Sequence, residues 1–282
     1  MKIHLVTVVG DDLTLLPHML NHYRRAGIES FIINVHAKTK SDPLLEEARR
    51  VAADFGLEIS AVVVGEWSDA LNSRLYAESK KYPEDWYVMA DLDEFHRYPG
   101  GLSELIAECE RKGYDYIEGC LIDRIAADGG LQEVTRDRSI EDQFPLGCVL
   151  TYAILQGYPM EVVAAKGWVR LSGANHYALN GKGCPVDDCL VQVHHYKWVK
   201  GLVGRLKRRQ ASDRGLLTDL YRQECARFIE YFYANNGRID IADPRLLAAE
   251  CTQDYRYWPL IVEAVKSNPN RPGAHASAGA LN

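Results

Sequence analysis

The sequence predicts an α/β fold in which helices flank a mostly parallel β-sheet. Up to about residue 122, short runs of β-branched and apolar residues alternate with longer amphipathic stretches, as in sheets whose strands are joined by crossover helices. Gly, Pro, Asp or Ser residues stand at the boundaries between the two kinds of segment. With 282 residues, of which 47% are hydrophobic, the chain can bury the core of one large domain.

The strands predicted for this part cover residues 3–9, 31–36, 57–64, 86–90 and 114–122. Helices are predicted between them, at about 14–27, 43–56, 68–80 and 102–111. Thr14 is a candidate N-cap of the first helix, which tolerates Pro17 in its first turn and ends at Gly27. Asp42 and Pro43 begin the second helix.

Beyond residue 122 the alternation is lost. Residues 123–185 are rich in Gly, Pro and Asp, and we expect them to form loops that shape a substrate cleft. One more strand is predicted at 190–196, before helical stretches at about 199–235 and 244–266. The predicted division is a principal domain over 1–210, a C-terminal helical extension packed on it over 211–267, and a disordered tail over 268–282.

The charge balance argues against nucleic acid or anionic lipid as a partner. The 33 Lys and Arg residues are outnumbered by 39 Asp and Glu residues, which gives a net charge of -6. No apolar run reaches the roughly 18 to 20 residues that span a bilayer, and no signal peptide is visible. The seven cysteines are odd in number and scattered, which is typical of reduced thiols. We therefore expect a cytoplasmic protein without a transmembrane segment, for which peripheral docking on a membrane stays open.

Two aspartates follow the strand predicted at 86–90, and in open α/β sheets ligands bind beyond the carboxyl ends of the strands. Side chains alternate along an extended chain, so Asp91 and Asp93 would point to one side and Leu92 to the core. Two carboxylates this close repel each other, and Mg²⁺ or Mn²⁺ removes that cost while keeping positions open for phosphate oxygens. An Asp-x-Asp triplet is common as a simple cap, but the apolar strand before it and Glu94-Phe95 after it favour a metal site.

Histidines and basic residues end the strand predicted at 190–196. The imidazole of His194 or His195 can complete the ligand set of the two aspartates, and the alternation along the strand does not choose between them. Lys197 and the basic residues of the next predicted helix, Arg205 among them, can form charge-assisted hydrogen bonds with diphosphate oxygens. Taken alone, the histidine is more simply interpreted as a core residue, and the basic residues as a helix face exposed to solvent.

Together these segments resemble family 2 glycosyltransferases, in particular the bacterial branch with the motif Asp-x-Asp-Glu-Phe, here residues 91–95. The resemblance covers about residues 1–210 and includes the opening strand and helix, the Gly-x-x-His element at 173–176, and His195-Tyr196 before a basic helix. It implies the GT-A fold, which is Rossmann-like. It also implies transfer of a sugar from a nucleotide diphosphate with inversion.

The resemblance further implies roles for individual residues. Asp91 would contact the ribose and the metal, Asp93 would bind the metal, and His195 would approach the metal or the diphosphate. Such enzymes commonly have Arg-Asn-Glu after the first strand, whereas residues 9–12 are Val-Gly-Asp-Asp here, so the acidic contact falls to Asp11 or is absent. The UDP- or GDP-sugar donor would be bound by Thr7, Val9, Asp11, Asn34, His36, Arg74, Asp91, Lys197 and Arg205.

An inverting transfer needs a carboxylate that takes the proton of the acceptor hydroxyl. The resemblance implies a base at about the position of Asp187 or Asp188, which are slightly favoured, and Asp123 ends the strand predicted at 114–122. His176 is a candidate for holding acceptor or sugar hydroxyls, and Trp198 for stacking on a sugar face. The competing interpretation is that the acidic residues are exposed to solvent in loops and that the other candidates are packed in the core.

The sequence thus predicts a metal-dependent glycosyltransferase, of hexosyltransferase type, that acts on an unknown acceptor such as a glycan hydroxyl. A nucleotidyltransferase-like enzyme is the first alternative, although the basic phosphate loop that such enzymes carry after strand one is replaced by the acidic residues 10–12. A noncatalytic nucleotide-sugar-binding module is the second. Cys184 and Cys189 lack a companion pair for zinc and are interpreted as structural.

Overall fold

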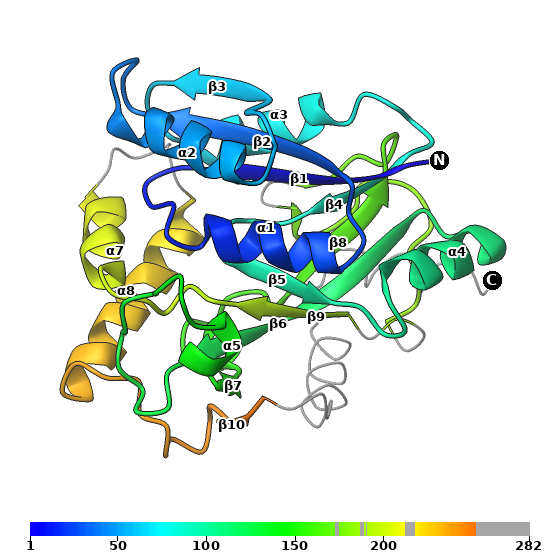
Figure 1. Ribbon diagram of the computed structural model, residues 1–282. Helices are drawn as coiled ribbons and strands as arrows, with labels where there is room; N and C mark the ends of the chain where they lie inside the picture. The colour runs from blue at the N-terminus through cyan, green and yellow to red at the C-terminus, as the bar shows by residue number, and fades with distance from the viewer. Residues whose placement is uncertain (173–174, 187–188, 190, 212–217, 252–282) are drawn as a thin grey trace.

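The computed structural model describes residues 1–172, 175–186, 189, 191–211 and 218–251, and shows helices on both faces of a mixed β-sheet (Figure 1). The N-terminal part of the sheet is parallel, in the order β3-β2-β1-β4. Its strands are β1 (Ile3–Val9), β2 (Ser30–Ala37), β3 (Ala61–Val64) and β4 (Trp86–Met89). The predicted α/β class, with helices flanking the sheet, is confirmed.

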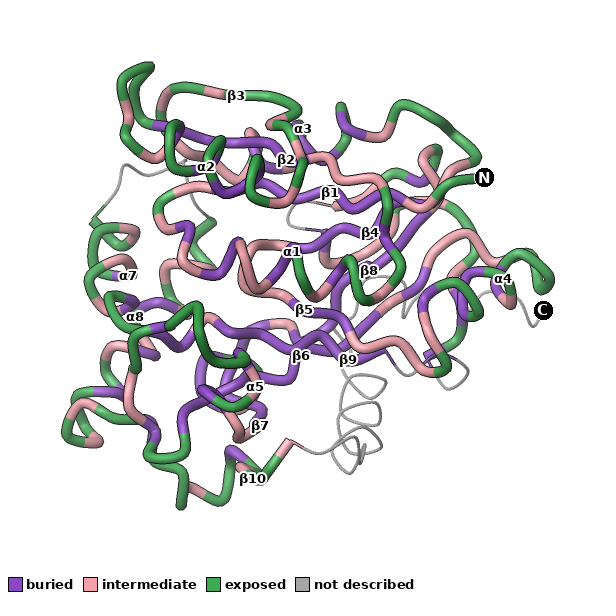
Figure 2. The backbone as a smooth tube through the Cα atoms, viewed as in Figure 1, coloured by how far each residue is buried: buried purple, intermediate pink, exposed green. Residues whose placement is uncertain are grey.

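Four helices cover this part of the sheet: α1 (Leu16–Arg25), α2 (Pro43–Asp54), α3 (Asp69–Ser79) and α4 (Leu102–Lys112). Val9 and Ile33 pack with Leu16 of α1, whereas Val6 packs with Tyr76 of α3 on the opposite face. Alternate residues of a strand face opposite sides of a sheet, so both faces of the central strands are covered. Figure 2 shows these strands in the colour of buried residues.

The helix boundaries follow local chemistry, with one exception. The Asp42 side chain accepts a hydrogen bond from the Leu44 amide, and Ser68 accepts one from the Leu71 amide, so both are N-caps. Thr14 is not an N-cap, because its hydroxyl and amide both donate to Asp12 and α1 begins two residues later. The prediction for Thr14 was therefore wrong.

The remaining strands make the sheet mixed. They are β5 (Glu94–Arg97), β6 (Tyr116–Ile125), β7 (Leu146–Cys148), β8 (Met160–Lys166), β9 (Val191–His195) and β10 (Ala249–Glu250). Strand β8 lies between β4 and β6 and is antiparallel to both. Strand β9 runs parallel to β6 and antiparallel to β5.

Residues 123–185 contain more regular structure than the expected loops. They include β7, β8 and the short helices α5 (Ile140–Gln143) and α6 (Leu150–Ala153). Strand β8 gives no alternating pattern because residues 160–165 are all buried. The expectation of loops throughout this segment was wrong for these elements.

Two helices follow β9 and pack against each other: α7 (Leu202–Ala211) and α8 (Asp219–Ala234). Leu202 of α7 and Phe228 of α8 share a buried cluster with Trp198 and with Ile125 of β6. Of the helix predicted at 244–266, the described part contains β10 instead. Residues 252–282, which include the tail predicted at 268–282, lie outside the described residues.

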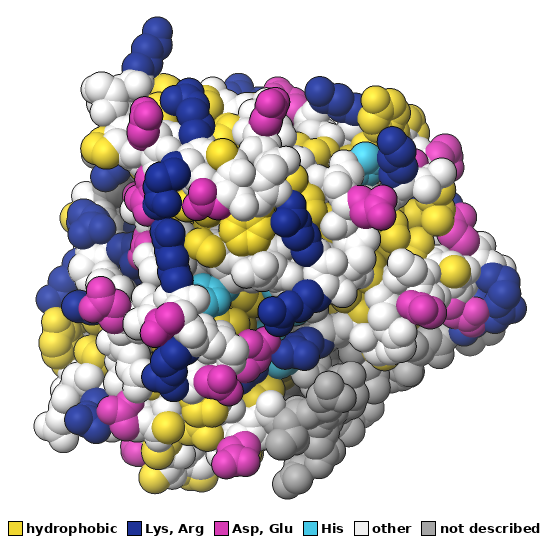
Figure 3. Space-filling view, in the orientation of Figure 1, with side chains coloured by type: hydrophobic (Ala, Val, Ile, Leu, Met, Phe, Trp, Pro, Cys, Tyr) yellow, Lys and Arg dark blue, Asp and Glu magenta, His cyan; other side chains and the backbone are white. Residues whose placement is uncertain are grey.

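Within the described part of the chain, no helix is both long and apolar enough to cross a bilayer. Cys184 and Cys189 form a disulfide bond, so the expectation of reduced thiols was wrong for this pair. Figure 3 shows basic and acidic side chains interspersed over one face of the molecule, as the balanced composition predicts.

Candidate functional site

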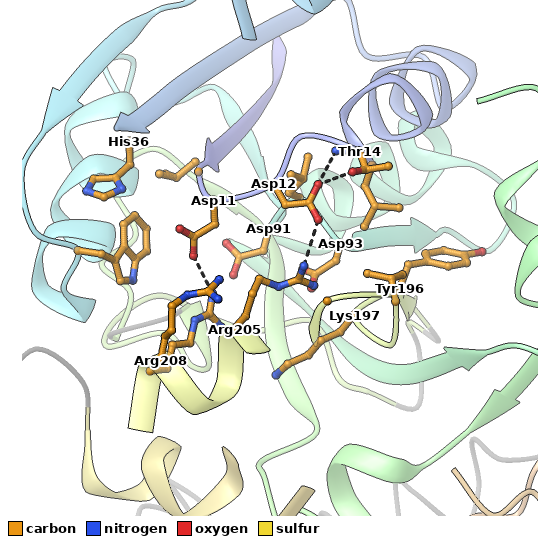
Figure 4. Close-up of a pocket in the computed structure, with 18 of the residues that line it drawn as sticks. Asp11, Asp12, Thr14, His36, Asp91, Asp93, Tyr196, Lys197, Arg205 and Arg208 are labelled. Atoms are coloured by element: carbon orange, nitrogen blue, oxygen red, sulfur yellow. Dashed lines mark hydrogen bonds and ion pairs between the residues drawn. The ribbon is translucent and has the colours of Figure 1, made fainter. Parts of the chain in front are cut away.

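A cavity of about 460 Å³ opens at the carboxyl ends of β1, β2 and β4. It is lined by the loop between β1 and α1, the end of β2, the turns after β3 and β4, and the segment from residue 196 into α7 (Figure 4). A Cβ atom added to Gly10 would lie 3.2 Å from the carbonyl oxygen of His36, so glycine allows the ends of β1 and β2 to approach each other here. The position is the one where open α/β sheets bind ligands.

A tight turn, rather than an extended strand, presents the two aspartates. The Glu94 amide donates to the Asp91 carbonyl oxygen at 3.0 Å, and the Asp91 amide donates to Oε2 of Glu94 at 2.8 Å. Leu92 packs against the core as predicted. The prediction that alternation along a strand aligns Asp91 with Asp93 was wrong, because the strand has ended before residue 91.

The two aspartates have different surroundings. Asp91 accepts a hydrogen bond from the Tyr76 hydroxyl at 2.8 Å. Burial, followed by the nearby Asp93 carboxylate, raises the pKa of Asp91 above its usual value. Asp93 instead faces His195, with 3.7 Å between Oδ2 and Nε2.

His195 is oriented by a buried carboxylate beneath it. Asp123, which is fully buried, lies 3.1 Å from Nδ1 of His195. A carboxylate oxygen accepts, so Nδ1 of His195 is the donor of this bond and Nε2 is the ring nitrogen directed towards Asp93. Pairs of this kind fix the orientation of metal-binding histidines.

Asp123 has further partners that hold it in place. It accepts hydrogen bonds from the amide and the hydroxyl of Thr151 and from Nε1 of Trp198, at 2.6, 2.7 and 2.9 Å. Because both of its oxygens are engaged and Asp123 does not line the cavity, the geometry favours a positioning role for it over that of a base.

His194 lies on the other side of β9. Its Nδ1 is 2.8 Å from Nη1 of Arg124 and its Nε2 is 3.0 Å from Oε1 of Gln192. The geometry therefore distinguishes the two histidines that periodicity left open, because the ring of His195 faces Asp93 of the aspartate turn and the ring of His194 faces Arg124 and Gln192.

Side-chain atoms of Asp93, Glu94 and His195 lie within 4.8 Å of one another. Two carboxylates and one imidazole form a donor set that fits Mn²⁺ or another divalent cation, so these residues could hold a metal. Asp91 is not part of this group. In the sequence, Glu94 was interpreted only as a residue that flanks the Asp-x-Asp motif. Its side chain belongs to this group because the turn directs it back to the Asp91 amide.

Basic side chains line the opposite side of the cavity. Lys197 and three arginines of α7 contribute, and Figure 4 shows Arg205 and Arg208 projecting from that helix. Nη1 of Arg205 lies 3.1 Å from Oδ2 of Asp12, and Nη2 of Arg209 lies 3.9 Å from Oδ2 of Asp11. The acidic loop after β1 thus holds the basic helix over the cavity. The sequence predicted Asp11, Lys197, Arg205 and the other basic residues of this helix here, but it assigned no contact to Asp12.

An aromatic residue lies beside the end of β2. The rings of His36 and Trp67 meet edge to face, with centroids 5.0 Å apart, and both residues line the cavity. Nε2 of His36 is 2.8 Å from the Gly65 carbonyl oxygen. His36 was predicted, whereas Trp67 was missed because nothing in the loop pattern marks it.

Four of the predicted donor contacts lie away from the cavity. Thr7 and Val9 are fully buried in the sheet, and it is Val8 between them that lines the cavity. Nδ2 of Asn34 donates to Oγ of Ser79 inside the protein. The fourth, Arg74, is exposed on α3, where it forms an ion pair with the next helical turn.

The predicted acceptor residues do not line the cavity either. Trp198 is fully buried and packs on Phe228, with ring centroids 4.7 Å apart. Nδ1 of His176 is 3.3 Å from the Met160 carbonyl oxygen, and the ring does not line the cavity. Asp187 and Asp188 lie outside the described residues, as do Gly173 and Ala174.

No protein-family model and no curated protein matches this sequence. Solved structures with some similarity include residues 1–349 of S. aureus TarS, with 10% identity, a TM-score of 0.36, and coverage of 94% of this chain and 79% of that one. Another is a putative glucose-1-phosphate thymidylyltransferase from Bacillus anthracis, with 9% identity, a TM-score of 0.30, and coverage of 100% and 97%. A third is 4-diphosphocytidyl-2C-methyl-D-erythritol synthase from Anaerococcus prevotii, with 11% identity, a TM-score of 0.30, and coverage of 84% and 86%. Similarities this low do not indicate a function, which has to be argued from the cavity.

Proposed function

We propose that the protein is a metal-dependent glycosyltransferase of the GT-A type, which moves a sugar from a nucleotide diphosphate to an acceptor hydroxyl with inversion. The main support is that one cavity is lined on one side by Asp93, whose carboxylate forms a group with Glu94 and His195 behind it, and on the other by Lys197 and the α7 arginines. A diphosphate bridged to a divalent cation needs both, because the cation requires acidic ligands and the phosphate oxygens require cationic donors.

The donor would lie across the cavity. Its nucleoside would lie near His36 and Trp67, where an aromatic ring offers a stacking surface. Its diphosphate would lie between Asp93 and Arg205. A bound Mn²⁺ or Mg²⁺ would neutralise the charge that develops on the leaving diphosphate.

The protein's own residues would prepare this site. The Asp123 carboxylate holds His195 with Nε2 towards Asp93, and Tyr76 holds one oxygen of Asp91. On donor binding, the phosphate oxygens would replace the Asp12 carboxylate as a partner of Arg205. Asp187 and Asp188 stay the proposed candidates for the base.

A direct test incubates the protein with a panel of UDP- and GDP-sugars and Mn²⁺, and measures nucleoside diphosphate release with and without simple sugar acceptors. We expect release that depends on Mn²⁺ and is abolished by Asp93→Asn. The exposed Asp54→Asn variant removes one carboxylate far from the cavity and should behave as the wild type.

Two other outcomes would contradict the proposal. Release of pyrophosphate from nucleoside triphosphates would indicate nucleotidyl transfer. Binding of nucleotide sugars without turnover on any acceptor or on water would indicate a noncatalytic binding module.

A further inference from the structure

A second group of potential metal ligands lies behind the aspartate turn. It consists of Glu94 and His96 on β5 and Glu161 on β8, whose ligand atoms lie within 4.8 Å of one another. His96 is 1% exposed and Glu161 is 5% exposed. Neither residue lines the cavity, and the group shares only Glu94 with the Asp93 and His195 group described above.

Two atoms of this group are buried without a hydrogen-bond partner. They are Nε2 of His96 and Oε1 of Glu161, which face each other at 3.8 Å. Buried polar atoms are nearly always satisfied, because an unpaired one costs about 1–3 kcal/mol. Two such atoms that face each other at this distance indicate that something binds between them.

Charge makes the same point. Among the described residues, no lysine or arginine forms an ion pair with Glu94 or Glu161, although Glu161 is buried. A buried carboxylate that is ionised needs a positive partner, either a side chain or a metal ion.

The histidine is also oriented as a ligand. Nδ1 of His96 lies 2.9 Å from the Tyr98 hydroxyl, and the His96 amide donates to the Tyr23 hydroxyl. When Nδ1 donates its proton to Tyr98, the lone pair of Nε2 points at Glu161. Outer partners of this kind fix the ring in metal-binding histidines.

We propose that Glu94, His96 and Glu161 bind a divalent first-row transition metal ion in the interior of the protein. One imidazole nitrogen and two carboxylates suit zinc, iron or manganese, and a dication makes the group neutral. Glu94 also accepts the Asp91 amide, so an ion that fixes Glu94 holds the turn from which Asp93 points into the cavity. The ion acts by positioning this turn and needs no contact with substrate.

The test measures zinc in the purified full-length protein after loading with ZnCl₂ and dialysis, by elemental analysis. Asp93→Asn is used as the background, because it removes a ligand of the group that faces the cavity. We expect about one zinc ion per chain in this background, and about a 10- to 100-fold loss of zinc affinity on adding His96→Gln or Glu161→Gln. Adding His194→Gln, which changes a buried histidine outside the group, should leave the zinc content unchanged.

Crystals of the zinc-loaded wild type provide a second measurement that does not depend on the folding of any variant. An anomalous peak between Nε2 of His96 and Oε1 of Glu161 is expected. Density without anomalous signal at this position would show a water molecule and would overturn the proposal. Zinc content that is negligible in the Asp93→Asn background, or unchanged by His96→Gln, would overturn it as well.

Discussion

Replacing Asp123 with asparagine removes one oxygen of a fully buried carboxylate that serves four hydrogen-bond donors. Oδ2 accepts from the Thr151 amide, and Oδ1 accepts from the Thr151 hydroxyl, His195 and Trp198. An asparagine that keeps its oxygen at Oδ1 turns its NH₂ group towards the Thr151 amide. The variant therefore loses a charge-assisted hydrogen bond, about 1.5–3 kcal/mol, and leaves a buried donor unsatisfied, about 1–3 kcal/mol.

We expect Asp123→Asn to lower the free energy of unfolding by about 2.5–6 kcal/mol, a large part of the roughly 5–15 kcal/mol typical of a domain. Urea unfolding followed by circular dichroism in EDTA measures this without any metal contribution. The Asp54→Asn control, at a side chain that is 58% exposed, should change stability by about 0.5 kcal/mol or less. A loss below about 1 kcal/mol for Asp123→Asn would refute the hydrogen-bond argument.

The same variant tests the orientation of His195. Without the Asp123 carboxylate, Nδ1 is no longer fixed as the protonated nitrogen, so Nε2 is less available to a cation near Asp93. We expect the affinity for Mn²⁺ to fall by about 10- to 100-fold, measured by calorimetry at a temperature where the variant is folded. Unchanged affinity would show that His195 does not approach the metal.

Three further predictions concern pH and donor binding. Burial lowers the pKa of His22 from 6.5 to about 4, so the free energy of unfolding falls as the pH is lowered between these values. Urea unfolding at about pH 7 and about pH 4.5 measures this fall, which should be smaller in His22→Gln than in the wild type. Equal losses would be inconsistent with a buried neutral histidine. Arg205→Ala should weaken binding of Mn²⁺ with a nucleoside diphosphate by about 10- to 100-fold in calorimetry, whereas Lys207→Ala, on the same helix but bonded to Tyr233, should not. Trp67→Ala should weaken binding of UDP or GDP by about 5- to 100-fold and leave binding of inorganic pyrophosphate unchanged, and an equal effect on both would exclude a nucleoside contact.

The N-terminal part of the fold could be predicted because its patterns are local. β-Branched runs mark β1 and β2, and Asp42 with Pro43 marks the start of α2. The end of β4 also placed the aspartate motif at the edge of the sheet where the cavity lies. Predicting these features requires only the periodicity of side chains along one segment and the rule that ligands bind beyond the carboxyl ends of strands.

Strands whose residues do not alternate were missed. Strand β8 is buried along its length, and β5 is polar, with Glu94 and His96 turned into an internal cluster. Local patterns cannot show that a polar residue will meet a partner inside the protein, because that partner is distant in sequence.

Pairings between distant residues decided the details of the site. The Asp123 and His195 contact joins residues 72 positions apart, and it distinguishes His195 from His194, which periodicity alone could not do. The tight turn at Asp91 similarly depends on the Glu94 side chain returning to the backbone. Candidate residues such as Asn34 and Trp198 were placed on the correct segments, but their side chains face the interior.

The central claim is that Asp93 and the basic helix hold a metal-bound nucleoside diphosphate between them. Calorimetric titration of UDP and GDP, with Mn²⁺ and with EDTA, into the wild type and Asp93→Asn tests it most directly. We predict binding of at least one of the two that is tighter with Mn²⁺ than with EDTA in the wild type, and no such difference in Asp93→Asn. Equal affinities with Mn²⁺ and EDTA in the wild type, or an intact Mn²⁺ dependence in Asp93→Asn, would contradict the claim.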